Sequence, residues 1–285
     1  MEIQNKNTLL YHVEMRYNVG SLKKYFWRNI MIFETHAHYE DEQFNEDREA
    51  LLTSLAENGI GYVVNVASSL ETIPKTVHLM EQYSFLYGAI GVHPEECGEL
   101  TEENFSVIEE NLKREKTVAV GEIGLDYYWD TVEKDIQKKW FERQIALAGT
   151  YKKPMIIHSR DAAKDTLDIM KGSQAAEIGG VIHCFSYGVE MAREYLNMGF
   201  YLGIGGVVTF KNAKKLKEVV AYAPIDRILL ETDCPYLAPV PNRGKRNSSL
   251  NLVYVAEEVA KLKNMDYDEV VAITEKNAKE MYSVS

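Results

Sequence analysis

Histidine and acidic residues recur in this sequence directly after short apolar runs, where side chains from distant parts of a chain can meet. Five of the seven histidines follow such runs, and so do one glutamate and one aspartate. Imidazole and carboxylate together suit Zn, Mn, Fe or Co, and more than one ion can be held when a carboxylate bridges. The candidate metal ligands are His36, His38, Glu122, His158, His183 and Asp233.

The pair His36 and His38 falls on one face of a strand, because side chains alternate with a period of two. Taken alone, His-x-His is a weak signal, since two solvated or core histidines give the same pattern. Here, however, Glu122, His158 and His183 stand at the ends of successive apolar runs, about one strand–helix unit apart. This regular spacing favours a shared metal site.

The apolar runs themselves predict eight strands, separated by segments whose apolar residues have helical spacing, such as 44–57, 137–148 and 213–221. Strands that alternate with helices pair in parallel, and eight such units match a closed (β/α)8 TIM barrel whose active site lies at the carboxyl ends of the strands. An open doubly wound sheet is the alternative, which a count of strands does not exclude. The predicted strands are 32–35, 62–67, 86–92, 118–123, 155–158, 180–184, 201–204 and 228–232.

Composition narrows the class of protein. The 285 residues carry a formal net charge of −11, so the protein is not expected to bind nucleic acid through its overall charge. A local site can still act on nucleic acid. No run approaches 18 apolar residues, which argues against a membrane span. Three cysteines without a C-x-x-C pair favour a reducing cytoplasm over a disulfide scaffold.

The first 30 residues differ from the rest, with five basic and two acidic residues and no continuous apolar stretch of a secretory signal. An apolar strand begins at Met31. We therefore expect residues 1–30 to be an N-terminal extension from a mis-assigned start, with a genuine basic arm as the alternative. Residues 31–285 are expected to form a single domain.

Several motifs, in this order, resemble the TatD family of metal-dependent deoxyribonucleases. The resemblance runs from about residue 31 to 282 and departs mildly at Glu34, where the family usually has Asp, and at Tyr39-Glu40, where it usually has Leu-Asp. The motifs are Thr35-His36-Ala37-His38, Gly91-Val92-His93-Pro94, Gly121-Glu122-Ile123-Gly124-Leu125-Asp126-Tyr127, Ile157-His158-Ser159-Arg160-Asp161-Ala162, His183-Cys184-Phe185, Glu231-Thr232-Asp233-Cys234-Pro235-Tyr236-Leu237, Pro241-Asn242-Arg243-Gly244-Lys245-Arg246-Asn247 and Asn277-Ala278.

The resemblance implies a division of the ligands between two divalent metal ions, with Mg, Mn and Zn as the candidates. His36, His38 and Asp233 would hold one ion, His158 and His183 the other, and Glu122 would bridge them. It also implies a DNA substrate, cut at phosphodiester bonds and expected to be attacked from a single-stranded or 3′ end.

Other residues receive roles in the same hypothesis. Two ions activate a water and stabilise both oxygens of an in-line displacement, with Asp233 and Glu122 as the catalytic carboxylates and Asp233 as general base. His93 and Arg160 are expected to bind phosphate oxygens. Glu231 and Asp126 are expected to orient ligands from behind the ions. A basic loop is expected to bind the phosphates that flank the cleaved bond, through Arg243, Lys245 and Arg246.

Two other functions fit the same ligands. A metal-dependent ester hydrolase acting on a nucleic-acid carrier, such as a D-aminoacyl-tRNA deacylase, would need the same activated water. A non-catalytic metal-binding scaffold would keep the fold without turnover.

Two further groups of residues have open or secondary roles. The aromatic residues 127–129 could stack on bases or simply pack. Cys184 and Cys234 each follow a candidate ligand, so strand alternation is expected to turn their thiols outward against the helices.

Overall fold

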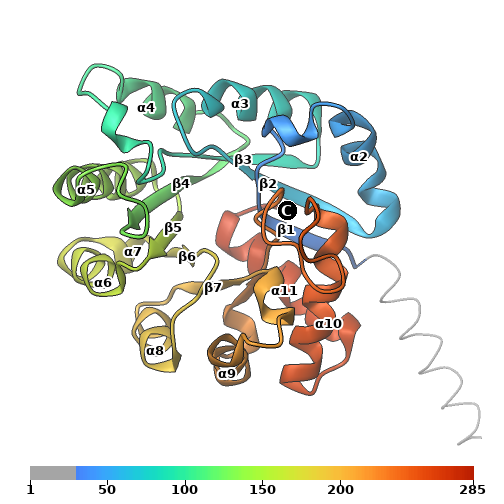
Figure 1. Ribbon diagram of the computed structural model, residues 1–285. Helices are drawn as coiled ribbons and strands as arrows, with labels where there is room; N and C mark the ends of the chain where they lie inside the picture. The colour runs from blue at the N-terminus through green and yellow to red at the C-terminus, as the bar shows by residue number, and fades with distance from the viewer. Residues whose placement is uncertain (1–29) are drawn as a thin grey trace, which may run out of the picture. The chain divides into compact units, whose positions relative to one another are not determined.

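Eight parallel strands form the centre of the molecule in a computed structural model that describes residues 30–285. Each strand pairs with the next one along the chain, from β1 to β8 (Figure 1). The predicted extension 1–30 lies outside the described residues except for Ile30. The strands are β1 Ile32–Ala37, β2 Ile60–Val66, β3 Leu86–Ile90, β4 Thr117–Asp126, β5 Met155–Arg160, β6 Gly180–Ile182, β7 Tyr201–Ile204 and β8 Ile228–Leu230.

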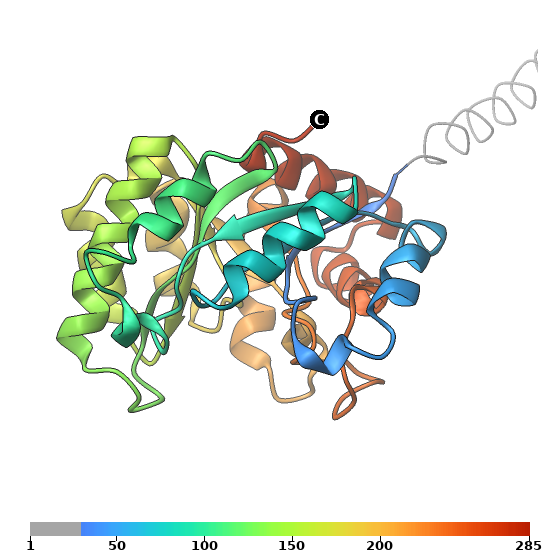
Figure 2. The same ribbon diagram turned by 90° about the horizontal axis from the view of Figure 1, so that it is seen from above.

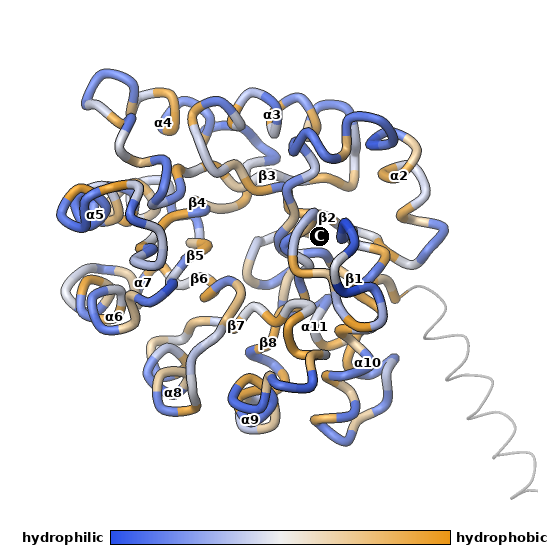
Figure 3. The backbone as a smooth tube through the Cα atoms, viewed as in Figure 1, coloured by the Kyte–Doolittle hydropathy of each residue, from blue (hydrophilic) through white to orange (hydrophobic). Residues whose placement is uncertain are grey.

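Helices surround this sheet on its outside (Figures 1 and 2). Along them hydrophilic and hydrophobic residues alternate, as expected for elements with one face on the strands and one in water (Figure 3). None of the described helices is long and apolar enough to span a membrane. The helices are α2 Arg48–Ser54, α3 Thr72–Gln82, α4 Ser106–Leu112, α5 Lys134–Tyr151, α6 Ala163–Gly172, α7 Ala175–Ile178, α8 Val189–Asn197, α9 Lys214–Tyr222, α10 Leu252–Lys263 and α11 Tyr267–Tyr282.

The eight predicted strands are all present, and their unbroken order confirms the (β/α)8 barrel over an open doubly wound sheet, whose strand order would reverse. Their bounds differ in places: β4 extends to Asp126, whereas β6 and β8 each end two residues early. The predicted helix 44–57 is divided into α2 and two short 3₁₀ helices, η2 Glu42–Phe44 and η3 Ala56–Asn58. The Arg48 side chain donates to carbonyl groups of the preceding turn, which holds that turn outside the helix.

The barrel closes between the segments of its first and last strands through two backbone hydrogen bonds, His38 to Cys234 and Asp233 to His36, and through side chains. A single bridge pairs Ala37 with Cys234. Below it the buried carboxylate of Glu34 accepts hydrogen bonds from the backbone N–H of Thr232, at 2.9 Å, and from its hydroxyl, at 2.6 Å. Glu34, the departure from the family pattern, therefore substitutes for ladder hydrogen bonds at this seam.

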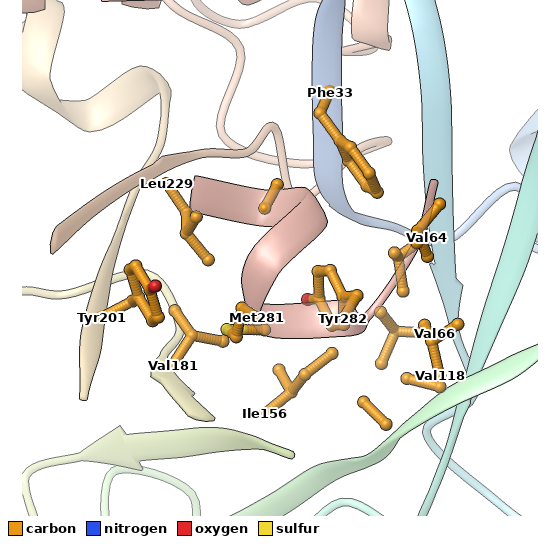
Figure 4. Close-up of a cluster of buried hydrophobic side chains, with 14 residues drawn as sticks. Phe33, Val64, Val66, Val118, Ile156, Val181, Tyr201, Leu229, Met281 and Tyr282 are labelled. Atoms are coloured by element: carbon orange, nitrogen blue, oxygen red, sulfur yellow. The ribbon is translucent and has the colours of Figure 1, made fainter. Parts of the chain in front are cut away.

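The amino-terminal half of the barrel is filled with apolar side chains from all eight strands. Met281 and Tyr282, at the end of α11, lie among them (Figure 4). The Tyr282 hydroxyl donates to the carbonyl of Thr35 at 3.0 Å, so the last helix is joined to the first strand. The end of α11 thus plugs the bottom of the barrel.

Towards the carboxyl ends the same inward-facing positions become polar. On β5 the apolar Ile156 is followed two residues later by His158, and Val181 on β6 is followed in the same way by His183. Glu231, directly after β8, follows Leu229 by two residues, and a side chain at Gly203 would lie 2.3 Å from its carboxylate. The fold therefore gathers the candidate ligands above an apolar plug.

Candidate metal centre

The six predicted ligands meet at the carboxyl ends of the strands. We call this set the metal centre: His36 from β1, Glu122 from β4, His158 from β5, and His38, His183 and Asp233 from the residues that follow β1, β6 and β8. The side chain of Glu122 is 5% exposed, whereas those of Asp233 and His158 are 18% and 17% exposed, so the centre opens to solvent at these two residues.

Glu122 stands in the middle of the centre and faces two different groups of imidazoles. Its Oε2 atom lies 3.4 Å from Nε2 of His36 and 3.9 Å from Nε2 of His38. Its Oε1 atom lies 2.8 Å from Nδ1 of His158 and 3.7 Å from Nε2 of His183. A carboxylate with one oxygen on each side is placed to bridge two cations.

The first group has the spacing of a cation cage. Four donors about 2.1 Å from one cation in a tetrahedron lie about 3.4 Å from one another. Here Nε2 of His36 and Nε2 of His38 are 3.1 Å apart, and Oδ1 of Asp233 lies 3.7 and 3.4 Å from them. Glu122 Oε2 completes the set at the distances already given. These residues therefore fit one divalent cation.

The second group joins Glu122, His158 and His183. The donor atoms of His36, Glu122 and His183 lie within 4.8 Å of one another, as do those of His183 and Asp233. Nε2 of His183 is 3.7 Å from both Glu122 Oε1 and Asp233 Oδ1. Oε1 of Glu122 thus lies next to both imidazoles, whose ring centroids are 6.5 Å apart.

Contacts behind the ligands select which imidazole nitrogen faces the centre. Nδ1 of His38 lies 2.8 Å from the carbonyl oxygen of Val66 and must carry its proton, which leaves Nε2 free to bind. Nε2 of His158 lies 2.9 Å from the Asp126 carboxylate, which leaves Nδ1 facing Glu122. Carboxylates in this position fix the tautomer and raise the basicity of a metal-binding histidine.

Glu231 has a similar position behind His183, with its Oε1 atom 3.2 Å from Nδ1 of the ring. The same oxygen accepts the backbone N–H of Cys184. Asp126 and Glu231 therefore each lie next to the ring of one candidate ligand, and their role in orienting ligands stays a prediction.

The ionisation of the centre follows from its crowding. Burial alone would lower the pKa of both His158 and His183, but adjacent carboxylates raise each pKa to about 9. Burial opposes ionisation of Glu122 as well, yet the surrounding imidazoles hold the pKa of its carboxyl well below the usual range. Without metal at neutral pH, the centre therefore contains imidazolium–carboxylate pairs, in which protons occupy the positions of the cations.

His93 enters the centre as a hydrogen-bond donor. Its Nδ1 accepts the backbone N–H of Glu95 at 3.2 Å, so in the neutral ring Nε2 carries the proton. Nε2 lies 3.7 Å from Glu122 Oε1, and burial together with neighbouring His158 lowers the pKa of His93 to about 3. A neutral ring with an N–H at the edge of the centre suits a ligand oxygen better than a cation.

The basic residues predicted to bind phosphate do not share one environment. The guanidinium of Arg160, at the end of β5, lies 3.7 Å from the ring centroid of Tyr128. Arg243 lies over Phe210, and Lys245 is exposed on the same loop. Arg246 instead forms an ion pair with Asp47 and lies over a phenylalanine ring. A carboxylate of its own chain therefore already neutralises Arg246, a partner that sequence spacing did not indicate.

The prediction for Cys184 was wrong. Its sulfur lies within 4.8 Å of donor atoms of His183 and Asp233, so the thiol faces the centre and not the helices. Strand alternation does not apply, because β6 ends at Ile182 and Cys184 has a φ of 45°, in the left-handed region. Cys234 is buried, as predicted, and the three cysteines are unpaired.

Comparison with known proteins places these features in a family. Residues 33–283 match the family model described as TatD related DNase. The chain is 47% identical over 255 residues to YabD of Bacillus subtilis, covering 90% of this chain and all of that protein. It is 34% identical to YcfH of Escherichia coli K12, over 90% of this chain and 97% of the relative. Both are described as uncharacterized metal-dependent hydrolases.

A solved structure agrees with the sequence relatives. The crystal structure of YjjV, a TatD homolog from Escherichia coli K12, superposes with a TM-score of 0.84 at 30% identity, covering 89% of this chain and 98% of YjjV. Barrel, ligand positions and relatives lead to one conclusion. The chain belongs to the TatD family and is a metal-dependent hydrolase.

Proposed function

We propose that this hydrolase cleaves phosphodiester bonds of DNA and removes nucleotides from a 3′ end. The observation that carries the proposal is the two-sided position of Glu122, with a group of imidazoles on each carboxylate oxygen. Two divalent cations at such a centre supply positive charge for the attacking water and for the oxygens of the phosphate. The description of the matching family model as TatD related DNase supports the same chemistry.

Asp233 is the general base in this proposal. Burial raises the pKa of its carboxyl, but the nearby imidazoles lower it further, so the group is ionised at neutral pH. Its side chain is the most exposed of the carboxylates in the centre, and a water can reach it there. The Asp233 carboxylate would accept the proton of the attacking water.

In this proposal His93 and Arg160 bind the phosphate. His93 directs an N–H toward the centre, because its other ring nitrogen is occupied by Glu95. Arg160 follows His158 by two residues on β5, on the same face of the strand, and its guanidinium has no ion pair among residues 30–285. Both would donate to non-bridging oxygens and hold the phosphorus close to the attacking water.

The imidazole-rich ligands favour transition metals for tight binding, and Mg, Mn and Zn are the cations to compare. We place the reaction in the cytoplasm, in keeping with three unpaired cysteines.

The test starts with the full chain stripped of metal and then supplied with Mg²⁺, Mn²⁺ or Zn²⁺. Two substrates are prepared from one single-stranded DNA sequence, the first labelled at the 5′ end and the second at the 3′ end. We expect stepwise shortening of the first and immediate release of a labelled mononucleotide from the second. The His36→Ala/His38→Ala variant should lose both reactions.

A parallel arm supplies D-aminoacyl-tRNA, the substrate of the alternative ester hydrolase. Cleavage of that ester without cleavage of DNA, or two bound ions with no turnover of either substrate, would overturn the proposal. The second outcome would leave a metal-binding scaffold.

A further inference from the structure

Two aromatic side chains beside the metal centre are about half exposed to solvent. Tyr128 is 54% exposed and Trp129 is 48% exposed, which is unusual for side chains of this size. The two rings meet edge to face, with centroids 4.8 Å apart. The guanidinium of Arg160 lies over both rings, 3.7 Å from the Tyr128 centroid and 5.7 Å from that of Trp129. We call these three side chains the aromatic platform.

The platform is tied to the metal centre through one carboxylate. Oδ1 of Asp126 accepts the backbone N–H groups of Tyr128, at 2.8 Å, and of Trp129, at 3.2 Å. Oδ2 of the same carboxylate lies 2.9 Å from His158 Nε2. One buried side chain therefore sets both the metal-facing nitrogen of His158 and the backbone that carries the rings.

The segment that carries the two rings, residues 126–132, is also bonded to α5. The buried side chain of Gln137, on α5, accepts from the backbone N–H of Asp126 and donates to its carbonyl and to that of Val132. The backbone around the rings is thus fixed by buried hydrogen bonds, while the rings themselves remain in solvent. A segment that needed Tyr128 and Trp129 only for packing would bury them.

We propose that the aromatic platform stacks an unpaired nucleobase next to the phosphate that is cleaved. Base–aromatic stacking is tolerant of sequence and contributes about 1–3 kcal/mol per base. The flat guanidinium of Arg160 lies on Tyr128, and its edge N–H groups remain available to a phosphate. Base and phosphate of one nucleotide would then be held by adjacent groups. This inference rests on the proposed function.

The platform determines which nucleic acids are substrates. A base inside a duplex already has neighbours on both faces, whereas a base in a single strand or at a frayed end has a free face. We therefore expect single-stranded DNA to be preferred over a blunt duplex of the same sequence. RNA offers the same bases, so an RNA strand of identical sequence separates recognition of the base from recognition of the sugar.

The test compares two strands that differ only in the last nucleotide, which carries a base in one and is abasic in the other. For the metal-loaded full chain we expect the strand with the base to have a kcat/KM about 5- to 150-fold higher, mainly through KM. In the Tyr128→Ala/Trp129→Ala variant this ratio should fall toward one. The Tyr128→Phe/Trp129→Phe variant, which keeps two rings, should retain most of it.

The matched control is Tyr222→Ala. Tyr222 is 45% exposed on α9 and lies 5.8 Å from the guanidinium of Arg193, so it repeats the arginine–tyrosine pair away from the metal centre. Its removal should leave the ratio at the wild-type value. Affinity for a hydrolysis-resistant phosphorothioate strand, measured by fluorescence anisotropy, should follow the same order among the variants.

The outcomes separate the two proposals. If the wild-type chain cleaves both strands equally, the platform proposal is wrong while the nuclease proposal stands. A double-alanine variant that loses activity on both strands by the same factor also contradicts stacking, since the substitutions would then have damaged the centre. Absence of cleavage of any strand by the wild-type chain overturns the proposed function itself.

Discussion

The carboxylate of Asp126 allows a sharp prediction about one half of the metal centre. In Asp126→Asn, the amide oxygen can still accept the N–H groups of Tyr128 and Trp129, so the loop keeps its position. The amide nitrogen then faces Nε2 of His158. A donor at this place requires an unprotonated Nε2, which moves the ring proton to Nδ1, the atom that faces Glu122.

The size of the effect can be estimated in two ways. Removing a carboxylate that supports a metal-binding histidine typically costs about 10- to 100-fold in metal affinity. The hydrogen bond from His158 to a charged group is worth about 1.5–3 kcal/mol, which corresponds to about 10- to 150-fold. We therefore expect one cation to bind about 10- to 100-fold more weakly. The cation held by His36, His38 and Asp233 should keep its affinity.

The assay is a calorimetric titration of the metal-free chain with Mn²⁺ or Zn²⁺ at constant pH. Asp165→Asn is the control, because the Asp165 carboxylate accepts from Tyr127 at 2.8 Å and from Lys138 at 2.7 Å but is not bonded to any histidine within residues 30–285. Wild-type affinity for both cations in Asp126→Asn would refute the tautomer argument. An equal loss at both positions would refute the division of the centre into two groups.

Three further predictions follow from burial, backbone and charge. Because the pKa values of His158 and His183 are raised to about 9, both rings are protonated at pH 7, and a cation must displace those protons. Metal affinity should therefore rise from pH 7 toward pH 9, by up to about ten-fold per pH unit for each proton displaced. Calorimetry in buffers of different ionisation enthalpy should detect the protons released on metal binding. Metal binding without proton release would contradict this prediction. In Gly124→Ala the new Cβ would lie 1.9 Å from the carbonyl oxygen of His158, at a φ of 146°, so we expect a loss of roughly 1–3 kcal/mol in the free energy of unfolding, measured with urea. Tyr282→Phe removes the buried hydrogen bond to the carbonyl of Thr35 and should cost about 1 kcal/mol in the same assay, and an unchanged midpoint would show that the bond does not stabilise the barrel.

Features that depend on local pattern were predictable from the sequence. Each strand is a short apolar run, and the period of two that places Ile156 in the core also brings His158 to the inner surface at the carboxyl end. Because all eight strands run in one direction, their carboxyl ends lie at the same end of the barrel. The meeting of residues there can therefore be predicted without knowing any distance. The meeting of the candidate ligands at one end of the barrel could thus be predicted from spacing alone.

Features that depend on contacts between distant segments were not predictable in this way. Arg246 pairs with Asp47, 199 residues away, and no local pattern marks that partner. Glu34 closes the barrel seam against Thr232, a contact 198 residues apart. The inward turn of Cys184 depends on a strand that ends two residues early, and a one-residue change of backbone conformation is enough to reverse the side of a thiol.

The plug formed by the end of α11 has a consequence for the way the chain is made. A ribosome releases β1 long before Tyr282, yet the first strand is bonded to the hydroxyl of that tyrosine and packs on the apolar side chains beside it. Strand–helix units can collapse in order as they emerge, but the bottom of the barrel stays open until α11 has been synthesised. The nascent chain therefore exposes apolar strand surface until then, and its dependence on chaperones should be greatest just before α11 emerges.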